Sequence, residues 1–568
     1  MKKTAFLVAC LLFATGYLPA QVSLKEDINT VTVSNEYISV SFNKTNADLT
    51  AIHTKSGKNL LGKNGRGYLL GPGFSMSPAV FSVVRQTDEL IEIAFFHDAS
   101  NHFQYDLHYV LRKEISGIYC FLVQSHKAGD SMGVFGQTRW GIRGDENNFD
   151  YHLVRDTIQG PMPKMAELKP ENEIQDWTFT MADGTVYTKY NYADYIEGRH
   201  VHGMAGQKSG LGLFVIQASH EYLNGGPTKQ YQNVHSNPYL ICMFSCGHFL
   251  SDVRKNDNRI SDEWVKLNGP FLLYVNEKGS IEANWKDAKE QADQEIEQWP
   301  YAWMQHKEYP LQRGTVSGVF RVNNKAAASA HIILAADGYD WQAQTRGYIY
   351  STQTNEDGKF TLEHVRPGAY TLYAYGANQT GEYKQPIEVD DDAVNIAGIL
   401  NWNPPAPGKK LWQVGIADRT TKGFKFSDHK RDYGVFNEVP ANITFTIGKS
   451  NEATDWYYAQ TKQGTWTIAF DSKETLKGTA LLTIAIAGAA KNPLLVVSVN
   501  GEELGSFKPG NDASVYRSAI LGGYYQLKTI NFPAAKLKPG GNTITFSLPD
   551  VKPGGGVMYD AIKLEVGK

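Results

Sequence analysis

Basic, aromatic and imidazole side chains are interleaved between residues 137 and 235, and acidic residues are sparse at the motif positions. The motifs are Gln137-Thr-Arg139-Trp-Gly-Ile-Arg143, Gly160-Pro-Met-Pro-Lys164-Met-Ala-Glu-Leu-Lys169, Lys189-Tyr190-Asn-Tyr192, Arg199-His200-Val-His202 and, last, His235. Cationic side chains bind carboxylates, and aromatic faces stack on flat or ring-shaped partners. This composition favours a ligand that is anionic and built of rings.

Other kinds of chemistry have weaker signals. His200 and His202 alternate onto one face of a strand and could chelate zinc, but no third ligand stands at a matching spacing and the neighbouring bases repel a cation. No metalloprotease, esterase or nucleotide-binding motif occurs in a suitable context. Glycoside hydrolysis needs two carboxyl groups about 5 to 10 Å apart, and no short motif nominates such a pair. Hydrolase activity is therefore not excluded by the sequence. We expect no catalytic metal.

The same residues also have purely structural interpretations. His202 can be a hydrogen-bonded strand histidine, and Tyr190 and Tyr192 can form one core face of a strand. Arg143 can be a surface charge. From the residues alone these alternatives stay open.

Short alternating strands must position these motifs. The chain has 568 residues, too many for one core, and its 12% aromatic content with 53 glycines favours β-structure. Runs such as Tyr37–Phe42, Leu90–Phe96 and Leu211–Ile216 alternate apolar and polar residues. A net charge of −3 argues against a strongly basic nucleic-acid binder. We predict an all-β protein.

The N-terminus predicts export. Two lysines precede an apolar run from Ala5 to Leu18 that ends at Pro19-Ala20, the pattern of a secretory signal peptide and too short for a membrane span. We expect the mature protein to be secreted or periplasmic. Three cysteines remain after removal of Cys10, too few for a disulfide framework.

Changes of pattern divide the chain into parts. We predict a signal peptide at 1–20, a large β-sandwich at 21–305 that ends in a helix over Ile281–Met304, a small seven-stranded sandwich at 306–400 and a third β-domain at 401–568. In the middle part, Asn355-Glu-Asp-Gly predicts a hairpin, and Arg366-Pro-Gly predicts a turn followed by a strand. The Pro-rich Asn401-Trp-Asn-Pro-Pro-Ala-Pro segment marks the last boundary.

Several motifs together resemble one enzyme family. The segment TKYNYADYIEGRHVHGM resembles the KYxY…VHG signature of rhamnogalacturonan lyases, polysaccharide lyase family four. EYLNGGPTKQYQNVH, WKDAKEQADQEIEQWPYAWM, TNEDGKFTLEHVRPGAYTLYAYG, LWQVGIADRTTKGF and DWYYAQ continue the resemblance in order over most of the mature chain. It implies a galactose-mutarotase-like N-terminal sandwich, a fibronectin III-like middle sandwich and a C-terminal jelly-roll carbohydrate-binding-like domain.

The resemblance also implies an activity, that of a rhamnogalacturonan endolyase. Such an enzyme cleaves rhamnose–galacturonate linkages of rhamnogalacturonan I, a pectin backbone, by β-elimination, with lysine as base and histidine as acid. Basic side chains must neutralise the uronate carboxylate, because its charge opposes removal of the neighbouring C5 proton. A non-catalytic pectin-binding protein and a pectin-directed hydrolase are the alternatives.

The residues that match the family pattern define a predicted site. His202 in Val-His-Gly matches the family's histidine, and Arg139 matches an arginine that can hold the carboxylate, with Arg143 as a second. Tyr190 and Tyr192 match a pair of substrate-contacting tyrosines. For the lysine the chain offers Lys164, Lys169 and Lys189, and strand alternation would point Lys189 away from the side that carries Tyr190. We prefer Lys164, which follows Pro161-Met-Pro163 in a predicted loop, and expect Lys169 to contact the substrate.

The remaining expectations concern cofactors and partners. We expect no required cofactor, and a calcium ion, where present, to be structural in the C-terminal domain. The expected partner is the polysaccharide, with no nucleic acid, no membrane span and a monomeric state.

Overall fold

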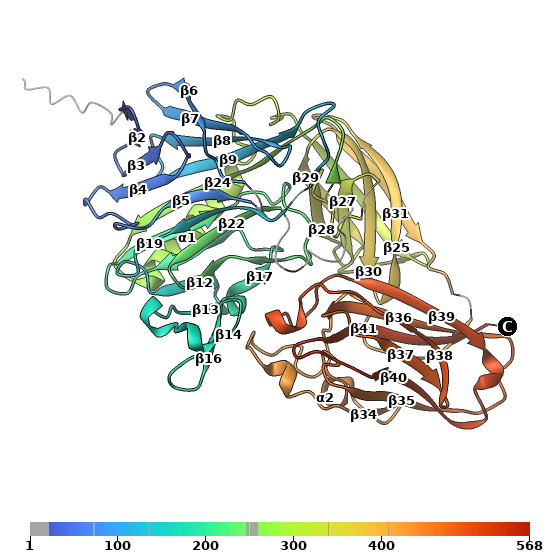
Figure 1. The fold of residues 1–568 in the computed structure, drawn as a ribbon. Coiled ribbons are helices and arrows are strands. Elements are labelled where there is room, and N and C mark those ends of the chain that lie inside the picture. The colour runs from blue at the N-terminus through green and yellow to red at the C-terminus, as the bar shows by residue number, and fades with distance from the viewer. Residues whose placement is uncertain are drawn as a thin grey trace, which may run out of the picture.

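Three β-sandwiches follow one another along the chain in the computed structural model, which confirms the predicted all-β class (Figure 1). The structure describes residues 22–71, 74–134, 136–245, 249, 259–338, 340–406 and 408–567. The predicted signal peptide at 1–20 lies outside these residues. Among the described residues, no helix combines the length and the apolar character needed to span a membrane.

The first sandwich packs an eight-stranded sheet against a nine-stranded one. The first sheet, in spatial order, consists of β1 (Ser23–Glu26), β2 (Thr30–Ser34), β3 (Ile38–Asn43), β4 (Leu49–Thr54), β5 (Gly67–Leu70), β11 (Thr138–Arg143), β22 (Tyr239–Ser245) and β21 (Val234–His235). The second consists of β13 (Ile158–Pro161), β12 (Tyr151–Arg155), β18 (Val201–Ala205), β19 (Leu211–Ile216), β24 (Trp264–Glu277), β9 (Gly117–His126), β8 (Gln104–Arg112), β7 (Leu90–Asp98) and β6 (Val80–Gln86).

Short elements decorate this sandwich. They are β10 (Gly133–Val134) paired with β23 (Arg259–Ile260), β17 (Ala193–Tyr195) paired with β20 (Gln230–Gln232), the small sheet of β14 (Glu173–Gln175), β15 (Thr178–Thr180) and β16 (Val186–Thr188), and the 3₁₀ turns η1 (Met165–Glu167), η2 (Pro170–Asn172) and η3 (Lys189–Tyr192).

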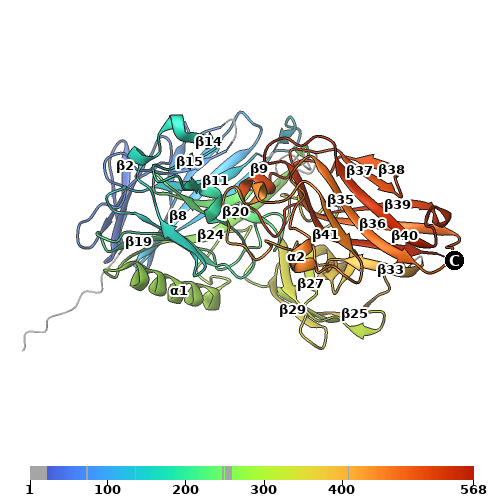
Figure 2. The ribbon, with the colours of Figure 1, turned by 90° about the horizontal axis from the view of Figure 1, so that it is seen from below.

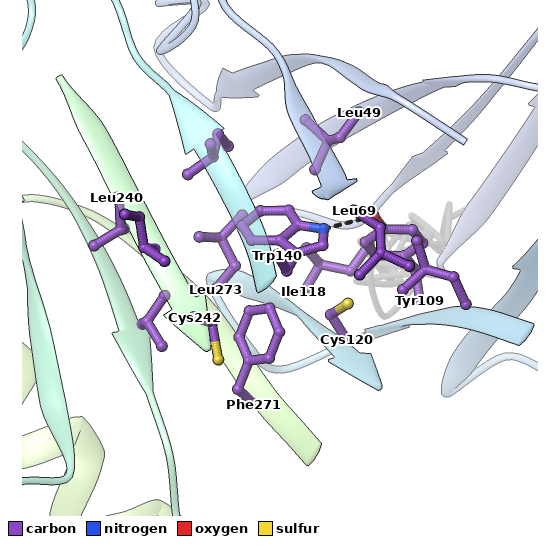
Figure 3. Close-up of a cluster of buried hydrophobic side chains, with 14 of the residues drawn as sticks. Leu49, Leu69, Tyr109, Ile118, Cys120, Trp140, Leu240, Cys242, Phe271 and Leu273 are labelled. Carbon is purple, nitrogen blue, oxygen red and sulfur yellow. Dashed lines mark hydrogen bonds between the residues drawn. The ribbon is translucent and has the colours of Figure 1, made fainter. Parts of the chain in front are cut away.

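Apolar side chains from both sheets meet in one core (Figure 3). Trp140 lies near its centre, completely buried, and its indole nitrogen donates a 2.8 Å hydrogen bond to the Tyr109 hydroxyl. Cys120 and Cys242 are buried free thiols in the same cluster. Burial raises the pKa of both thiols, so they behave as apolar core residues. The core holds β11 in place and thereby orients the side chains on its opposite face.

Helix α1 (Ile281–Gln298) covers the outer face of the nine-stranded sheet (Figure 2). Ser280 caps its N-terminus by accepting a 3.1 Å hydrogen bond from the Ala283 backbone nitrogen. The helix ends six residues before the predicted Met304. Pro300 accounts for the difference, because a proline disfavours the helical conformation of the residue before it, here Trp299.

The middle sandwich has two four-stranded sheets, one strand more than predicted because of the short β26. One sheet consists of β26 (Lys325–Ala326), β25 (Gly314–Val322), β29 (Lys359–Val365) and β32 (Val394–Trp402), and the other of β28 (Ile349–Gln353), β27 (His331–Ala336), β30 (Gly368–Gly376) and β31 (Gln379–Val389). The strand predicted after Arg366-Pro-Gly is confirmed as β30.

Two predictions for this middle part are wrong. The Asn355–Gly358 turn exists, but it joins β28 to β29, which pair with β27 and β25 in different sheets, so it is no hairpin. Turn residues specify a reversal of the chain and not the pairing of the strands on either side. Strand β32 crosses the predicted 400/401 boundary and ends at Trp402.

The third sandwich holds four and five strands. They are β33 (Lys409–Val414), β41 (Gly556–Val566), β36 (Thr479–Ala490) and β39 (Gln526–Pro533) in one sheet, and β34 (Ile443–Thr446), β35 (Gly464–Ser472), β40 (Gly540–Leu548), β37 (Leu495–Val499) and β38 (Glu502–Phe507) in the other. Its helical turns are α2 (Glu452–Asp455), η5 (Val435–Asn437), η6 (Val515–Arg517) and η7 (Ala534–Lys536). Figure 1 shows this part beside both other sandwiches.

A buried ionic cluster joins the first and middle sandwiches. Glu221, only 2% exposed, accepts hydrogen bonds from Arg313 Nη1 at 2.6 Å and Arg366 Nε at 2.9 Å. The Tyr350 hydroxyl donates a third, at 2.9 Å. Burial opposes the charge on Glu221, but Arg366 and Arg313 outweigh it and lower the pKa of the carboxyl. The carboxylate therefore stays ionised and balances two buried cations.

We expect Glu221→Gln to lower the free energy of unfolding by about 3–5 kcal/mol, because breaking a buried ion pair leaves uncompensated charge in the interior. Denaturant-induced unfolding would measure the change. Glu363→Gln is the matched control, since Glu363 is exposed and its replacement should change stability by no more than about 0.5 kcal/mol. Equal stability of the two variants would contradict a structural role for the cluster.

Candidate active site

Strand β11 presents two arginines on the outer face of the eight-stranded sheet. Trp140 and Ile142 are buried in the core, so the alternating neighbours Arg139 and Arg143 point the opposite way. Both stay partly exposed. The two arginines that match the family pattern therefore lie on one face of β11.

Tyr239, opposite Arg143 on the neighbouring strand β22, supports both guanidinium groups. They lie 5.7 Å (Arg139) and 4.7 Å (Arg143) from the centre of its ring, within the range of cation–π attraction. Gly141 makes room for this ring, because a Cβ at that position would lie 2.2 Å from the tyrosine hydroxyl oxygen. Glycine between the arginines thus lets the ring cross the strand and orient both cations.

Lys189 is the first residue of the 3₁₀ turn η3. The Thr188 hydroxyl accepts a 3.3 Å hydrogen bond from the Tyr190 backbone nitrogen and so caps the start of the turn. Lys189 is 5% exposed, and its Nζ donates a 2.8 Å hydrogen bond to Asp176 Oδ1. The Tyr190 hydroxyl donates to the other oxygen of Asp176. Both side chains of the Lys–Tyr pair therefore converge on one carboxylate.

The surroundings of Lys189 lower the pKa of its amine. Burial lowers the pKa of Lys189, Asp176 opposes this shift, and the charges of Arg517 and Arg139 add to the lowering. The pKa of Asp176 is itself lowered, because Lys189 and Tyr190 outweigh its partial burial. A buried lysine next to other cations is the arrangement in which a lysine can act as a general base.

His235, on β21, lies between two rings. Its imidazole centre is 5.2 Å from the ring of Trp177 and 4.9 Å from that of Tyr239. The Nδ1–H donates a 2.7 Å hydrogen bond to the Ser236 carbonyl, so Nε2 is the nitrogen that can exchange a proton with a ligand. Burial, followed by the charge of Lys189, holds the pKa of His235 well below its usual range.

Together these side chains form a cavity of about 430 Å³, which we call the basic pocket. Its charged and aromatic lining residues are Arg139, Arg143, Asp176, Trp177, Lys189, His235 and Tyr239. Three cations face one carboxylate, and that carboxylate is already paired with Lys189. The pocket therefore carries net positive charge and suits an anionic ligand.

Trp177 occupies a strained position in this pocket. Its φ of 54° lies in the left-handed region, which non-glycine residues adopt at a cost of about 1–3 kcal/mol. The turn between β14 and β15 places its half-buried ring beside His235. An indole in this position offers a flat face against which a sugar ring can stack.

The third sandwich contributes Arg517, the last residue of η6. Its guanidinium lies 5.0 Å from the centre of the Tyr190 ring, and its charge acts on both Asp176 and Lys189. The Tyr516 carbonyl accepts a 3.2 Å hydrogen bond from Gln175 Nε2 and so ties η6 to the first sandwich. No sequence motif links residues 176 and 517, so only the folded chain reveals this contact.

The predicted catalytic lysine, Lys164, and the predicted catalytic histidine, His202, both lie outside the basic pocket. Lys164 and Lys169 are exposed residues that precede η1 and η2, and neither lines the pocket. His202 is 2% exposed. Its Nδ1 accepts a 2.8 Å hydrogen bond from Arg199 Nη1, and its Nε2 donates a 2.7 Å hydrogen bond to the Ile241 carbonyl. Burial, followed by Arg199, holds the pKa of His202 well below its usual range. Both ring nitrogens of His202 are therefore engaged in hydrogen bonds within the fold.

The two predicted tyrosines, Tyr190 and Tyr192, also lie outside the basic pocket, at different places. Tyr190 is fully buried and contacts the pocket residues Asp176 and Lys189 from outside the cavity, whereas Tyr192 lines a different cavity. Of the predicted site residues, the structure brings Arg139 and Arg143 together in the basic pocket and separates the other five from it. The sequence signals for Lys189 and His235 were their places in the Lys-Tyr-Asn-Tyr and Asn-Val-His motifs.

Metal ligands do not gather in this region. Within the described ranges, no group of three or more histidine, cysteine, aspartate or glutamate side chains is placed to hold a metal ion.

Comparison with known proteins gives concordant matches along the chain. Residues 14–182 match the rhamnogalacturonate lyase family, residues 323–396 match domain II of polysaccharide lyase family 4, and residues 410–564 match its domain III, described as CBM-like. The matches follow the order of the three sandwiches.

Individual relatives agree with these matches. A rhamnogalacturonate lyase of Dickeya dadantii is 35% identical over 498 residues, which cover 86% of this chain and 83% of the relative. A probable rhamnogalacturonate lyase B of Aspergillus terreus is 25% identical and covers 73% of this chain and 75% of its own. Among solved structures, a galactose mutarotase-like protein of Lactobacillus casei is 10% identical, with a TM-score of 0.30 over 44% of this chain and all of its own.

Proposed function

The chain belongs to the rhamnogalacturonate lyase family of polysaccharide lyase family 4, and on that premise we propose that it cleaves rhamnogalacturonan I by β-elimination in the basic pocket. The reaction breaks the C5–H and C4–O4 bonds of a galacturonate, forms a C4=C5 double bond and releases the O4 end as an alcohol. The basic pocket supports this assignment, because it offers cations for a carboxylate and a buried amine for a proton.

Arg139 and Arg143 are the groups that hold the uronate carboxylate in this scheme. Both extend from one strand, and Tyr239 orients both. The negative charge of the carboxylate beside C5 opposes formation of a carbanion. The attraction between the two guanidinium groups and the carboxylate oxygens must therefore strengthen as further negative charge develops on those oxygens. Two preorganised guanidinium groups supply that stabilisation without rearrangement.

Lys189 is the base and His235 the acid. Neutral Nζ of Lys189 removes the C5 proton, and Nε2–H of His235 protonates the departing O4. In the free pocket burial, followed by the charge of Lys189, disfavours a charged imidazole. A bound carboxylate neutralises part of that field, which raises the pKa of His235 and makes a protonated acid accessible. The anionic substrate thereby prepares its own acid.

The observation that carries the proposal is the buried lysine among cations. A protein that only binds pectin would gain from a charged lysine at the surface and has no use for a buried one with a lowered pKa. A hydrolase needs two carboxyl groups, but the pocket lining contains a single acidic residue, Asp176, engaged with Lys189.

Incubation with rhamnogalacturonan I tests the proposal. The conjugated unsaturated uronate formed by elimination absorbs in the ultraviolet, and we expect this absorbance to rise together with new reducing ends. Reducing ends without absorbance would indicate a hydrolase, and binding without either product would indicate a binding protein. A rapid early fall in chain length would support internal cleavage, the predicted endolyase action.

The pH profile tests the electrostatic assignment. Arg517 lowers the pKa of Lys189, so Arg517→Gln should raise it. A base works unprotonated, so kcat/KM rises with pH through its pKa, and the rising limb should move to higher pH by on the order of one unit or less. Arg517→Lys keeps the charge and should leave the limb near its original position. A limb that moves to lower pH in Arg517→Gln would contradict Lys189 as the base.

A further inference from the structure

A second cavity lies between the first and third sandwiches, at the far end of η3 from Lys189. Its volume is about 560 Å³, within the range of clefts that enclose small ligands. Strand β13, η3 and β17 form one side, and the loop Ser427–Arg431 with Ile520 and Leu521 forms the other. We call it the interdomain cavity.

Two tyrosines give the cavity rigid aromatic walls. The ring of Tyr192 packs on buried His152 with centroids 4.0 Å apart, and the Tyr195 hydroxyl donates to the Gly522 carbonyl at 3.2 Å. Both side chains remain partly exposed on the cavity side. Fixed, partly exposed rings are suited to stacking against the apolar faces of sugars, since little side-chain freedom is lost on binding.

Arg431 provides a cation without an acidic partner. Its Nη2 donates to Gln230 Oε1 and its Nη1 donates to the Ser518 carbonyl at 3.4 Å, and both acceptors are neutral. Arg431 forms no ion pair with a carboxylate of the described residues. Burial lowers the pKa of Arg431, which expresses the cost of holding this charge away from water. An anionic ligand would offset that cost.

The other charges around the cavity do not cancel Arg431. Asp194, whose charge acts on Arg431, is paired with Arg155. On the exposed loop, Lys430 offsets Asp428. Asn191 also lines the cavity, and its Oδ1 accepts no hydrogen bond from any described residue. The walls thus combine ring faces, an unpaired cation and an amide.

We propose that the interdomain cavity is a second saccharide-binding site, in which Arg431 holds a uronate carboxylate and Tyr192 stacks on a sugar ring. The site takes an acidic oligosaccharide and requires the third sandwich, because the Ser427–Arg431 loop supplies the cation. It rests on the proposed function for the identity of the acidic sugar. Lys189 and Tyr192 stand at opposite ends of the four-residue η3, so one chain of sugars can occupy both cavities.

Binding to Arg431→Gln tests the site. The measurement is isothermal titration calorimetry with rhamnogalacturonan I oligosaccharides of graded length, in a Lys189→Ala background that prevents cleavage. Adding Arg431→Gln to this background should weaken the binding of long oligosaccharides about tenfold relative to the background alone. The shortest oligosaccharides, which cannot reach both cavities, should lose less. Arg321→Gln, a substitution of the same type on β25 of the middle sandwich, should bind like the background.

A second variant is needed because Arg431→Gln could weaken binding by disturbing the contact between the first and third sandwiches. Lys430→Glu reverses the charge at the cavity mouth on an exposed side chain, and it should weaken binding of long oligosaccharides in the same direction. Unchanged affinity at every length in both variants, with melting temperatures like that of the background, would overturn the proposal. The titrations do not need catalysis, so a wild-type protein without lyase activity would refute the proposed function and leave this test intact.

Discussion

Replacing Lys189 with alanine should lower kcat for β-elimination by about 10²- to 10⁴-fold, the usual contribution of a positioned proton-transfer group. The amine is buried beside Asp176, and Arg517 and Arg139 favour its neutral form. The measurement is the initial rate of ultraviolet absorbance on rhamnogalacturonan I at saturating substrate. Lys164→Ala is the matched control, because Lys164 is exposed and outside the basic pocket, and it should keep the wild-type rate.

Lys189→Arg separates the role of the charge from that of the base. Arginine keeps a positive charge at this position but stays protonated at any working pH, so it cannot accept the C5 proton. We expect it to be as inactive as Lys189→Ala while it still binds substrate. An active Lys189→Arg enzyme, or an inactive but folded Lys164→Ala enzyme, would contradict the assignment and favour the lysine predicted from the sequence.

Replacing His235 with alanine should also reduce kcat by about 10²- to 10⁴-fold, because the leaving O4 then departs without a proton. His235 faces the basic pocket between Trp177 and Tyr239, and its Nδ1 is already bound to the Ser236 carbonyl. The readout is kcat on the polymer. A substrate with a more acidic leaving group should recover part of the lost rate, which a merely structural histidine would not allow.

His202→Ala provides the contrast. It leaves the Ile241 carbonyl without its donor and Arg199 Nη1 without its acceptor, so the free energy of unfolding should fall by about 1–3 kcal/mol. Its folded fraction should keep a kcat close to that of the wild type. If a folded His202→Ala enzyme loses activity and His235→Ala does not, the histidine predicted from the sequence is the acid.

Alternation of apolar and polar residues was sufficient to predict the fold class. Strands β3, β7 and β19 lie where the pattern placed them. The period of two buries one side of β3, whereas β19 and the first six residues of β7 are buried on both sides. The same rule places Arg139 and Arg143 together, since Trp140 and Ile142 need the core. Local rules did not predict which strands pair, as the Asn355–Gly358 turn shows.

The lysine shows where the alternation rule fails. It places Lys189 and Tyr190 on opposite sides of a strand, but residues 189–192 form a 3₁₀ turn that the Thr188 hydroxyl starts. Both side chains then reach Asp176, which comes from another turn. A four-residue turn has too few residues to display a period of its own, so the sequence pattern could not separate it from the strand before it.

Local sequence thus determined the all-β architecture and the order of the parts, because backbone geometry and burial act over a few neighbouring residues, and the two arginines were predicted from their match to a family pattern. The catalytic candidates depend on burial and on charges that arrive from distant segments. Burial lowers the pKa of Lys189, and the charges of Arg517 and Arg139 add to this lowering against the opposing charge of Asp176. Arg517 comes from a different sandwich. Electrostatic interactions act through space and not along the chain, so only the tertiary structure decided which lysine and which histidine share a pocket.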